Sequence, residues 1–182
     1  MRFRFNERKS AQAAAYLIRR HEGSLNYMKL LKLLYLADRR VLVERGRTVT
    51  GDRMVSMDHG PVLSLTYSRI SEGPLETPSP WFDYISAPSG YDVSLVNPNP
   101  ETDELSQYEL RILDEVDDEF GALDKWVLRD LTHKLPEWVD PEGSSIAIRP
   151  ETILREYGKP EEEIERMTEE AEDVFFIDRY SR

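Results

Sequence analysis

The stretch LNYMKLLKLLYLADRRVLVERG, residues 25–46, predicts the element around which the rest of the chain packs. Its leucines recur at three- and four-residue spacing, and further apolar residues fill the positions between them, so the predicted helix is apolar almost all the way round. A helix of that kind is buried on most sides. Lys29 and Lys32 lie on its one polar strip, where we expect their charged ends to reach water. Gly46 ends the helix.

Shorter helices are predicted on both sides of this stretch from apolar periodicity and from capping residues. They cover about residues 7–21, 61–72, 107–120, 125–135, 150–158 and from Pro160 onward. Pro61 suits the first position of its helix. Ser106 and Glu109 match a capping box. In the last helix, Ile164, Met167, Ala171 and Phe175 form an apolar stripe beneath an acidic face.

Alternating residues predict a few short strands between the helices. Met54–Met57 reads as one strand, and residues 84–87 and 91–96 read as a hairpin around Pro88-Ser89-Gly90. Together they suggest a small three-stranded sheet. The expected fold is mainly α (α+β), a helical bundle around a central apolar helix with a small antiparallel β-sheet. We expect one domain over residues 1–182, in which residues 141–182 form an acidic helical C-terminal extension.

The charge of the chain is uneven along its length. Its 182 residues include 24 Lys and Arg against 35 Asp and Glu, a net charge of −11. Residues 1–100 carry four more basic than acidic residues, whereas residues 101–182 carry fifteen more acidic than basic ones. A uniformly basic groove is hard to build from this balance, which disfavours nucleic acid as a partner. An acidic face that attracts a basic protein is easier to build, and a merely solubilising surface is the alternative.

Several classes of site and location are excluded by composition. The chain has no cysteine, so it has no disulfide, thiolate zinc site, iron–sulfur cluster or cysteine nucleophile, and a reducing cytoplasm is the natural compartment. No apolar run approaches the ~20 residues that cross a bilayer, and the start does not resemble a signal peptide, so we expect no membrane contact.

The chain carries few residues of the kinds that do chemistry. Its three histidines are His21, His59 and His133, and they form no close pair of metal ligands. The sequence has neither a phosphate-binding loop nor a nucleophile elbow. Asp58 and His59 could belong to a hydrolase or metal site, although a hydrogen bond that fixes their loop is the simpler interpretation. We therefore expect no catalytic residue, no metal and no cofactor.

Two groups of residues together resemble a known family. NYMKLLKLLYLADR at 26–39, followed by HGPV at 59–62, resembles the Panacea domain, also called the SocA-like antitoxin domain. FGAL at 120–123, LTH at 131–133 and Trp138 resemble its second signature. The resemblance covers about residues 8–140.

The resemblance implies a non-enzymatic antitoxin of a two-gene toxin–antitoxin system, a kind often carried by phage or mobile elements. Such a protein neutralises a cognate toxin by direct protein–protein binding. One founding member is also an adaptor that delivers its toxin to a ClpXP-type protease, so an adaptor with the acidic tail as docking surface is the alternative. Many relatives carry a further DNA-binding segment, which we do not expect here. A second copy of the chain, in a homo-oligomer, is a further possible partner.

Candidate residues follow for the partner surface and for the fold. Interface anchors are commonly aromatic. The candidates for partner binding, each also interpretable as ordinary packing, are Tyr67, Trp81, Phe82, Tyr84 and Trp138. The motif residues that we expect to hold the fold are Lys29, Lys32, Leu33, Leu34, Tyr35, Asp38, His59, Gly60, Pro61, Val62, Thr132 and His133.

Overall fold

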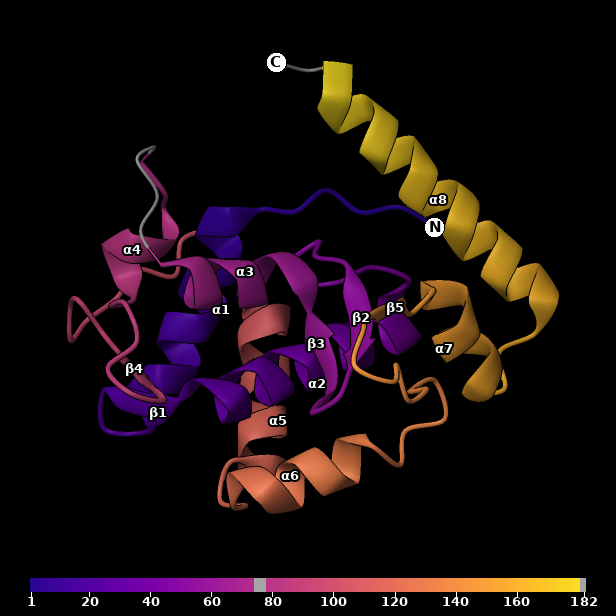
Figure 1. Ribbon diagram of the computed structural model, residues 1–182. Helices are drawn as coiled ribbons and strands as arrows, with labels where there is room; N and C mark the ends of the chain where they lie inside the picture. The colour runs from indigo at the N-terminus through magenta and orange to yellow at the C-terminus, as the bar shows by residue number, and fades with distance from the viewer. Residues whose placement is uncertain (74–77, 181–182) are drawn as a thin grey trace.

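The central helix is the core of the fold, as the sequence predicts. The computed structural model describes residues 1–73 and 78–180, with side chains as far as residue 177. Helix α2 (Tyr27–Arg45) runs through the middle of the molecule, and other helices cover it on several sides (Figure 1). The remaining helices are α1 (Glu7–Arg20), α3 (Ser64–Glu72), α4 (Trp81–Tyr84), α5 (Gln107–Phe120), α6 (Lys125–Thr132), α7 (Pro150–Glu156) and α8 (Glu161–Tyr180). The strands are β1 (Ser24–Asn26), β2 (Met54–Met57), β3 (Gly60–Leu63), β4 (Asp92–Ser94) and β5 (Ile146–Ala147).

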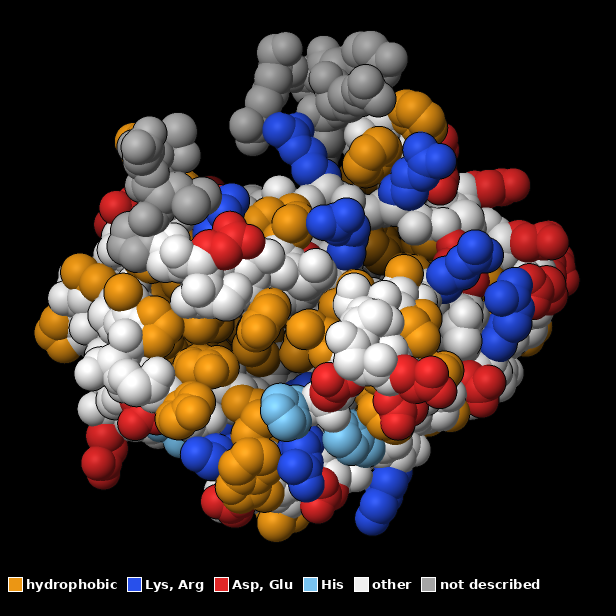
Figure 2. Space-filling model, viewed as in Figure 1, with side chains coloured by type: hydrophobic (Ala, Val, Ile, Leu, Met, Phe, Trp, Pro, Cys, Tyr) orange, Lys and Arg blue, Asp and Glu red, His pale blue; other side chains and the backbone are white. Residues whose placement is uncertain are grey.

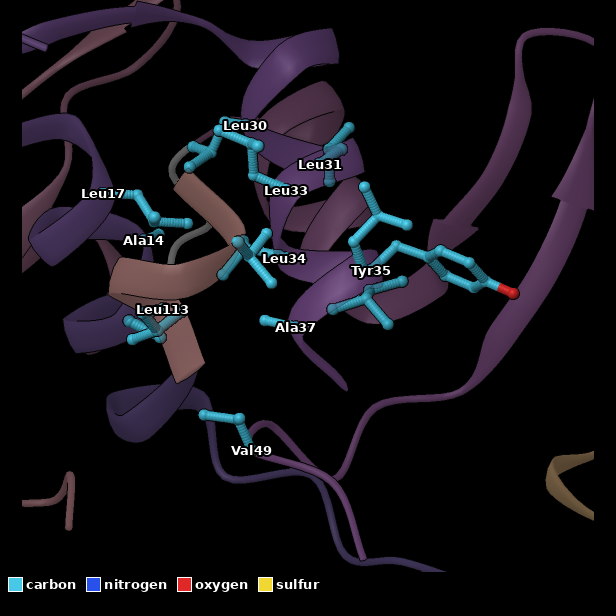
Figure 3. Packing of buried hydrophobic residues seen from close by; sticks show 14 of the residues in the cluster. Ala14, Leu17, Leu30, Leu31, Leu33, Leu34, Tyr35, Ala37, Val49 and Leu113 are labelled. Atoms are coloured by element: carbon cyan, nitrogen blue, oxygen red, sulfur yellow. The ribbon is translucent and has the colours of Figure 1, made fainter. Parts of the chain in front are cut away.

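Capping residues set both ends of helix α2. The side chain of Asn26 accepts a hydrogen bond from the Met28 amide at the start, and Gly46 takes a left-handed conformation (φ 66°) at the end. Leu33 and Leu34 of the motif are buried in the core. Figure 3 shows Leu17 of α1 and Leu113 of α5 packed around them. The fold is mainly α with short antiparallel strands, in agreement with the sequence prediction.

The predicted sheet, by contrast, is wrong in its pairing. Strand β2 pairs with β3 on one side and β5 on the other, and β4 pairs with β1 in a separate sheet. Pro61 therefore lies in a strand rather than at the start of a helix. Helix α3 begins at Ser64 because the buried carboxylate of Asp52 accepts hydrogen bonds from the Leu65 and Thr66 amides at 2.9 and 2.7 Å. A cap from outside the helix thus sets its start.

The predicted hairpin over residues 84–96 is only partly formed. Helix α4 takes up Trp81–Tyr84, and the two arms of the hairpin meet only in bridges between Ile85 and Leu95 and between Ser89 and Asp92. Strand β4 pairs instead with β1, immediately before α2. This pairing brings Tyr91 against the start of the central helix.

The C-terminal helix leaves the body of the molecule partway along its length (Figure 1). Ile164, Met167 and Ala171 are buried, as the apolar stripe predicts, but Val174 and Ile177 are 58% and 63% exposed. The N-terminal segment lies beside α8, and the terminal ammonium is 3.6 Å from Glu172. Within the described residues, no helix combines the length and apolar character that a membrane span requires.

Three buried polar side chains of α2 attach loops to the core. Asp38 accepts hydrogen bonds from the amides of Val49 and Thr50 at 2.8 and 3.1 Å, and burial raises the pKa of its carboxyl group to about 7. The Tyr35 hydroxyl donates to Glu137 at 2.8 Å, and Arg39 donates to the same carboxylate. The segments after α2 and after α6 are therefore held by one helix.

We predict that Asp38→Ala lowers the free energy of unfolding by about 2–4 kcal/mol, because it leaves two buried backbone N–H groups without an acceptor. Urea denaturation measures the change. Asp83→Ala, at an exposed position on α4, is the control and should leave the midpoint in place. Equal stability of the two variants would contradict the anchoring role of Asp38.

Candidate functional site

A groove of about 490 Å³ opens between the start of α2, the β2–β3 turn, α3 and the start of α6. Figure 2 shows hydrophobic side chains gathered on this face of the molecule, with histidine side chains at their edge. Four aromatic residues from four separate segments line it, and we call it the aromatic groove: Tyr27, Tyr67, Tyr91 and Trp126. Leu31 and Val62 form an apolar floor.

Two of the four aromatic walls are exposed, whereas Tyr27 and Tyr67 are partly buried against the core. Tyr91 is 69% exposed and Trp126 is 47% exposed. The rings of Tyr27 and Tyr91 lie 6.0 Å apart between centroids. The Lys125 ammonium lies 5.8 Å from the Tyr91 centroid and 5.5 Å from the Trp126 centroid, so one cation spans both walls. Exposed aromatic rings around a hollow are typical of a surface that another molecule covers.

Hydrogen bonds fix the backbone of the two residues that carry the exposed rings. The Tyr27 amide and the Asn26 side chain both donate to the Tyr91 carbonyl, at 2.9 and 3.1 Å. Asp124 caps α6 by accepting from the Trp126 amide at 2.8 Å, which places this tryptophan in the first turn. Leu128 is fully buried on the inner face of α6, so Trp126, two residues before it, lies toward the outside. The groove is therefore built on anchored backbone.

Lys32 lies beneath the groove, and here the sequence expectation is wrong. Its side chain is fully buried instead of reaching water, because strand β3 covers it and the Pro61 carbonyl accepts its hydrogen bond at 2.7 Å. Among the residues that the structure describes, no carboxylate pairs with it. Burial lowers the pKa of Lys32 to about 7.

A tight layer of side chains lies behind Lys32. A Cβ at Gly60 would meet the Lys32 Nζ and the Thr132 Oγ1 at 2.9 Å, and the backbone there has a φ of +89°. His133 stacks on Trp138 with 4.3 Å between ring centroids, and its buried Nε2 has no hydrogen-bond partner in the described part of the chain. Burial lowers the pKa of His133, and the nearby charges of Lys32 and Arg129 lower it further.

Only one of the five predicted partner-binding residues lines the groove, and that residue is Tyr67. Trp138 is half-buried and donates its indole N–H to the Met57 carbonyl at 3.2 Å, which clamps the β2–β3 hairpin. Trp81 is fully buried and Tyr84 is 9% exposed, because α4 packs against α1. Phe82 is partly buried against the same core. In this structure Trp81 and Tyr84 thus offer almost no surface to a partner.

The sequence analysis missed three of the four aromatic walls. Tyr27, Tyr91 and Trp126 are far apart along the chain, and only tertiary structure brings them together. For Trp126 a local indication was present: it does not share the face of Leu128 and Thr132, the two buried residues of α6. An aromatic residue on the outer face of an amphipathic helix is a candidate for an interface.

Asp58 and His59 lie on the rim of the aromatic groove. The Asp58 carboxylate accepts from the Gly143 amide at 3.0 Å, and the His59 ring meets the edge of Trp126 at 6.4 Å. In residues 1–73 and 78–177, no group of three His, Asp or Glu side chains is placed to hold a metal ion. Here Asp58 joins the β2–β3 turn to the segment before β5, and His59 contributes to the groove wall.

A comparison with family models identifies the domain. Residues 30–139 match the family described as "Antitoxin SocA-like, Panacea domain", which covers more than half of the chain. The matched range includes the groove floor and three of its four aromatic walls, whereas Tyr27 precedes it. No curated protein and no solved structure showed a significant match.

We predict that Gly60→Ala destabilises the protein more than Gly23→Ala does. Both glycines have a similar positive φ, +89° and +85°, and the strain of that conformation costs about 1–3 kcal/mol for another residue. Only at Gly60 does the added methyl group also collide with neighbours. Urea denaturation of both variants isolates the collision. A loss at Gly23 as large as that at Gly60 would show that the packing around Lys32 is loose.

We predict that Lys32→Met is more stable than the natural protein near neutral pH. The difference in free energy of unfolding between the two proteins should become smaller as the pH rises. From about pH 7 to about pH 10 the unfolded lysine keeps a proton that the folded one releases, so the stability of the natural protein rises by up to about 1.4 kcal/mol for each pH unit. Methionine has no such titration. Unfolding curves at several pH values measure the gap, and a gap independent of pH would refute the lowered pKa.

Proposed function

The chain belongs to the family of SocA-like antitoxins with a Panacea domain, and on that premise we propose that it neutralises a cognate toxin by direct protein–protein binding. We assign the aromatic groove as the surface that the toxin contacts. The proposal places both proteins in the cytoplasm, as the two products of a toxin–antitoxin pair carried by a phage or mobile element. It requires no catalysis by this chain.

One observation carries the assignment of the surface. The aromatic groove combines a hollow of about 490 Å³ with exposed aromatic rings around an apolar floor. Binding energy at protein interfaces is concentrated in a few such residues, with tryptophan and tyrosine foremost among them. Covering Tyr91 and Trp126 would remove from water the two most exposed rings of the groove.

The scaffold supports inhibition by occlusion. The groove walls come from α2, α3, α6 and the segment before β4, each attached to the core by packing or by backbone hydrogen bonds. Because the site is largely preformed, little conformational entropy is lost when a partner binds. A rigid surface of this kind disables a toxin by covering its active region or by distorting it.

We predict that the product of the adjacent gene arrests growth when it is expressed alone and that this chain relieves the arrest. The double variant Tyr91→Ala/Trp126→Ala should bind that product about tenfold more weakly or worse, because it removes two exposed anchors. Growth after co-expression and the dissociation constant from titration calorimetry are the two measurements.

Val127→Ala and Tyr157→Ala are matched controls, because both residues are more than half exposed and neither lines the groove. Both should neutralise normally, and unfolding curves should show that every variant is folded. A harmless neighbour, or one that does not bind, would overturn the antitoxin function. Full binding by the double variant would overturn only the choice of surface.

A further inference from the structure

The aromatic groove carries positive charge that the rest of the fold leaves uncompensated. Lys125 on its rim and Lys32 beneath it have no ion pair among the described residues. Asp58 is the one carboxylate in its lining, and it accepts a hydrogen bond from Gly143 at 3.0 Å. The chain has a net charge of −11. Two lysines without an ion pair in one groove therefore contribute charge opposite in sign to that of the chain.

The two lysines are placed to act on one bound group. Lys125 spans the rings of Tyr91 and Trp126, so its charge lies where the two exposed walls approach each other. Lys32 lies below, with the Pro61 carbonyl as its one hydrogen-bond acceptor in the described structure. An ammonium group can donate three hydrogen bonds. A positive charge buried without a counter-charge is costly, and a nearby anion would reduce that cost.

The remaining walls favour apolar contact. Leu31 and Val62 are almost fully buried in the floor, and the tyrosine rings of α2 and α3 flank them. A ligand with charge alone would leave the exposed rings of Tyr91 and Trp126 in water. A ligand with apolar groups alone would leave both ammonium groups without a counter-charge.

We propose that the aromatic groove selects a toxin segment that combines an apolar side chain with a carboxylate. The carboxylate pairs with Lys125 at the rim and lies within the field of Lys32, while the apolar side chain packs against the rings of Tyr91 and Trp126. This inference deepens the proposed function and rests on it for the identity of the partner. Binding of a basic or an uncharged segment is the contrary outcome.

A pair of small probes tests the chemistry without the toxin. 3-Phenylpropanoate and 3-phenylpropanamide have the same apolar group and differ in charge. We expect the carboxylate to shift the NMR signals of the Trp126 indole and the Lys125 side chain in a saturable manner, with the amide at least about fivefold weaker, a difference of about 1 kcal/mol. Equal binding of the two probes, or no binding of either, would overturn the proposal.

Three lysine variants test which lysine recognises the carboxylate of the probe. Lys125→Met and Lys32→Met should each reduce the preference for the carboxylate over the amide, and both remove charge without introducing a polar group. Lys29→Met is the control, because Lys29 lies on the same helix as Lys32 but outside the groove lining. Unchanged preference in both groove variants would show that the lysines do not recognise the anion.

The pH dependence of carboxylate binding distinguishes the contribution of Lys32 from that of Lys125. Between about pH 7 and about pH 9 the carboxylate should bind progressively more weakly to the natural protein as Lys32 loses its proton, and this trend should vanish in Lys32→Met. Asp58, His59 and Lys125 line the groove together with Lys32. His133 lies on its other side and is influenced by Lys32 and also by Arg129 and Asp130 of α6. The pKa of His133 is lowered by burial, which places its change of charge below this range. A trend that persists in Lys32→Met would assign it to another group.

The toxin itself provides the final comparison. Lys125→Glu should weaken toxin binding more than Lys125→Met does, because it adds repulsion to the loss of attraction. If Lys125→Glu instead binds more tightly, the toxin segment is basic and the inference fails, while the antitoxin function stands. If the probes behave as expected and the adjacent gene product does not bind, the antitoxin function fails and the groove chemistry stands.

Discussion

The fold depends on the burial of residues 30–39 of α2, polar side chains included. Lys32, Tyr35 and Asp38 are all buried, and a buried polar group without a partner costs free energy. Each finds its partner on another segment: the Pro61 carbonyl, Glu137, and the Val49 and Thr50 amides. These bonds attach the β2–β3 hairpin, the segment after α6 and the loop after α2 to one helix, so the position of each depends on the others.

The aromatic groove is a consequence of this arrangement. The hairpin is held from one side by Lys32 and from the other by Trp138, and Gly60 allows the close packing between them. The same hairpin supplies Val62 to the groove floor and His59 to its rim. Residues that hold the fold therefore also shape the groove.

The chemistry of the groove agrees with a protein that acts by contact. Its exposed parts are aromatic rings and a lysine ammonium, which bind through apolar burial, cation–π contact and charge. The acidic character of the chain is concentrated elsewhere, as on α8, whose first turn carries Glu161, Glu162 and Glu163. An opposite charge at the groove would orient an approaching acidic segment toward it.

The sequence by itself determined most of the helices, because apolar periodicity, the capping box at Ser106 and Glu109, and Gly46 act within a few residues. It did not give α4 or the start of α3. It also contained the family motifs, and one of the aromatic residues that it singled out, Tyr67, lines the groove. Only the tertiary structure decided which strands pair, where Lys32 lies, and that Tyr27, Tyr91 and Trp126 meet. The physical reason is the separation along the chain of the residues that interact. Caps and periodicity involve residues a few positions apart. Strand pairing, burial of a charge and assembly of a groove depend on distant segments, which approach only when the core has formed.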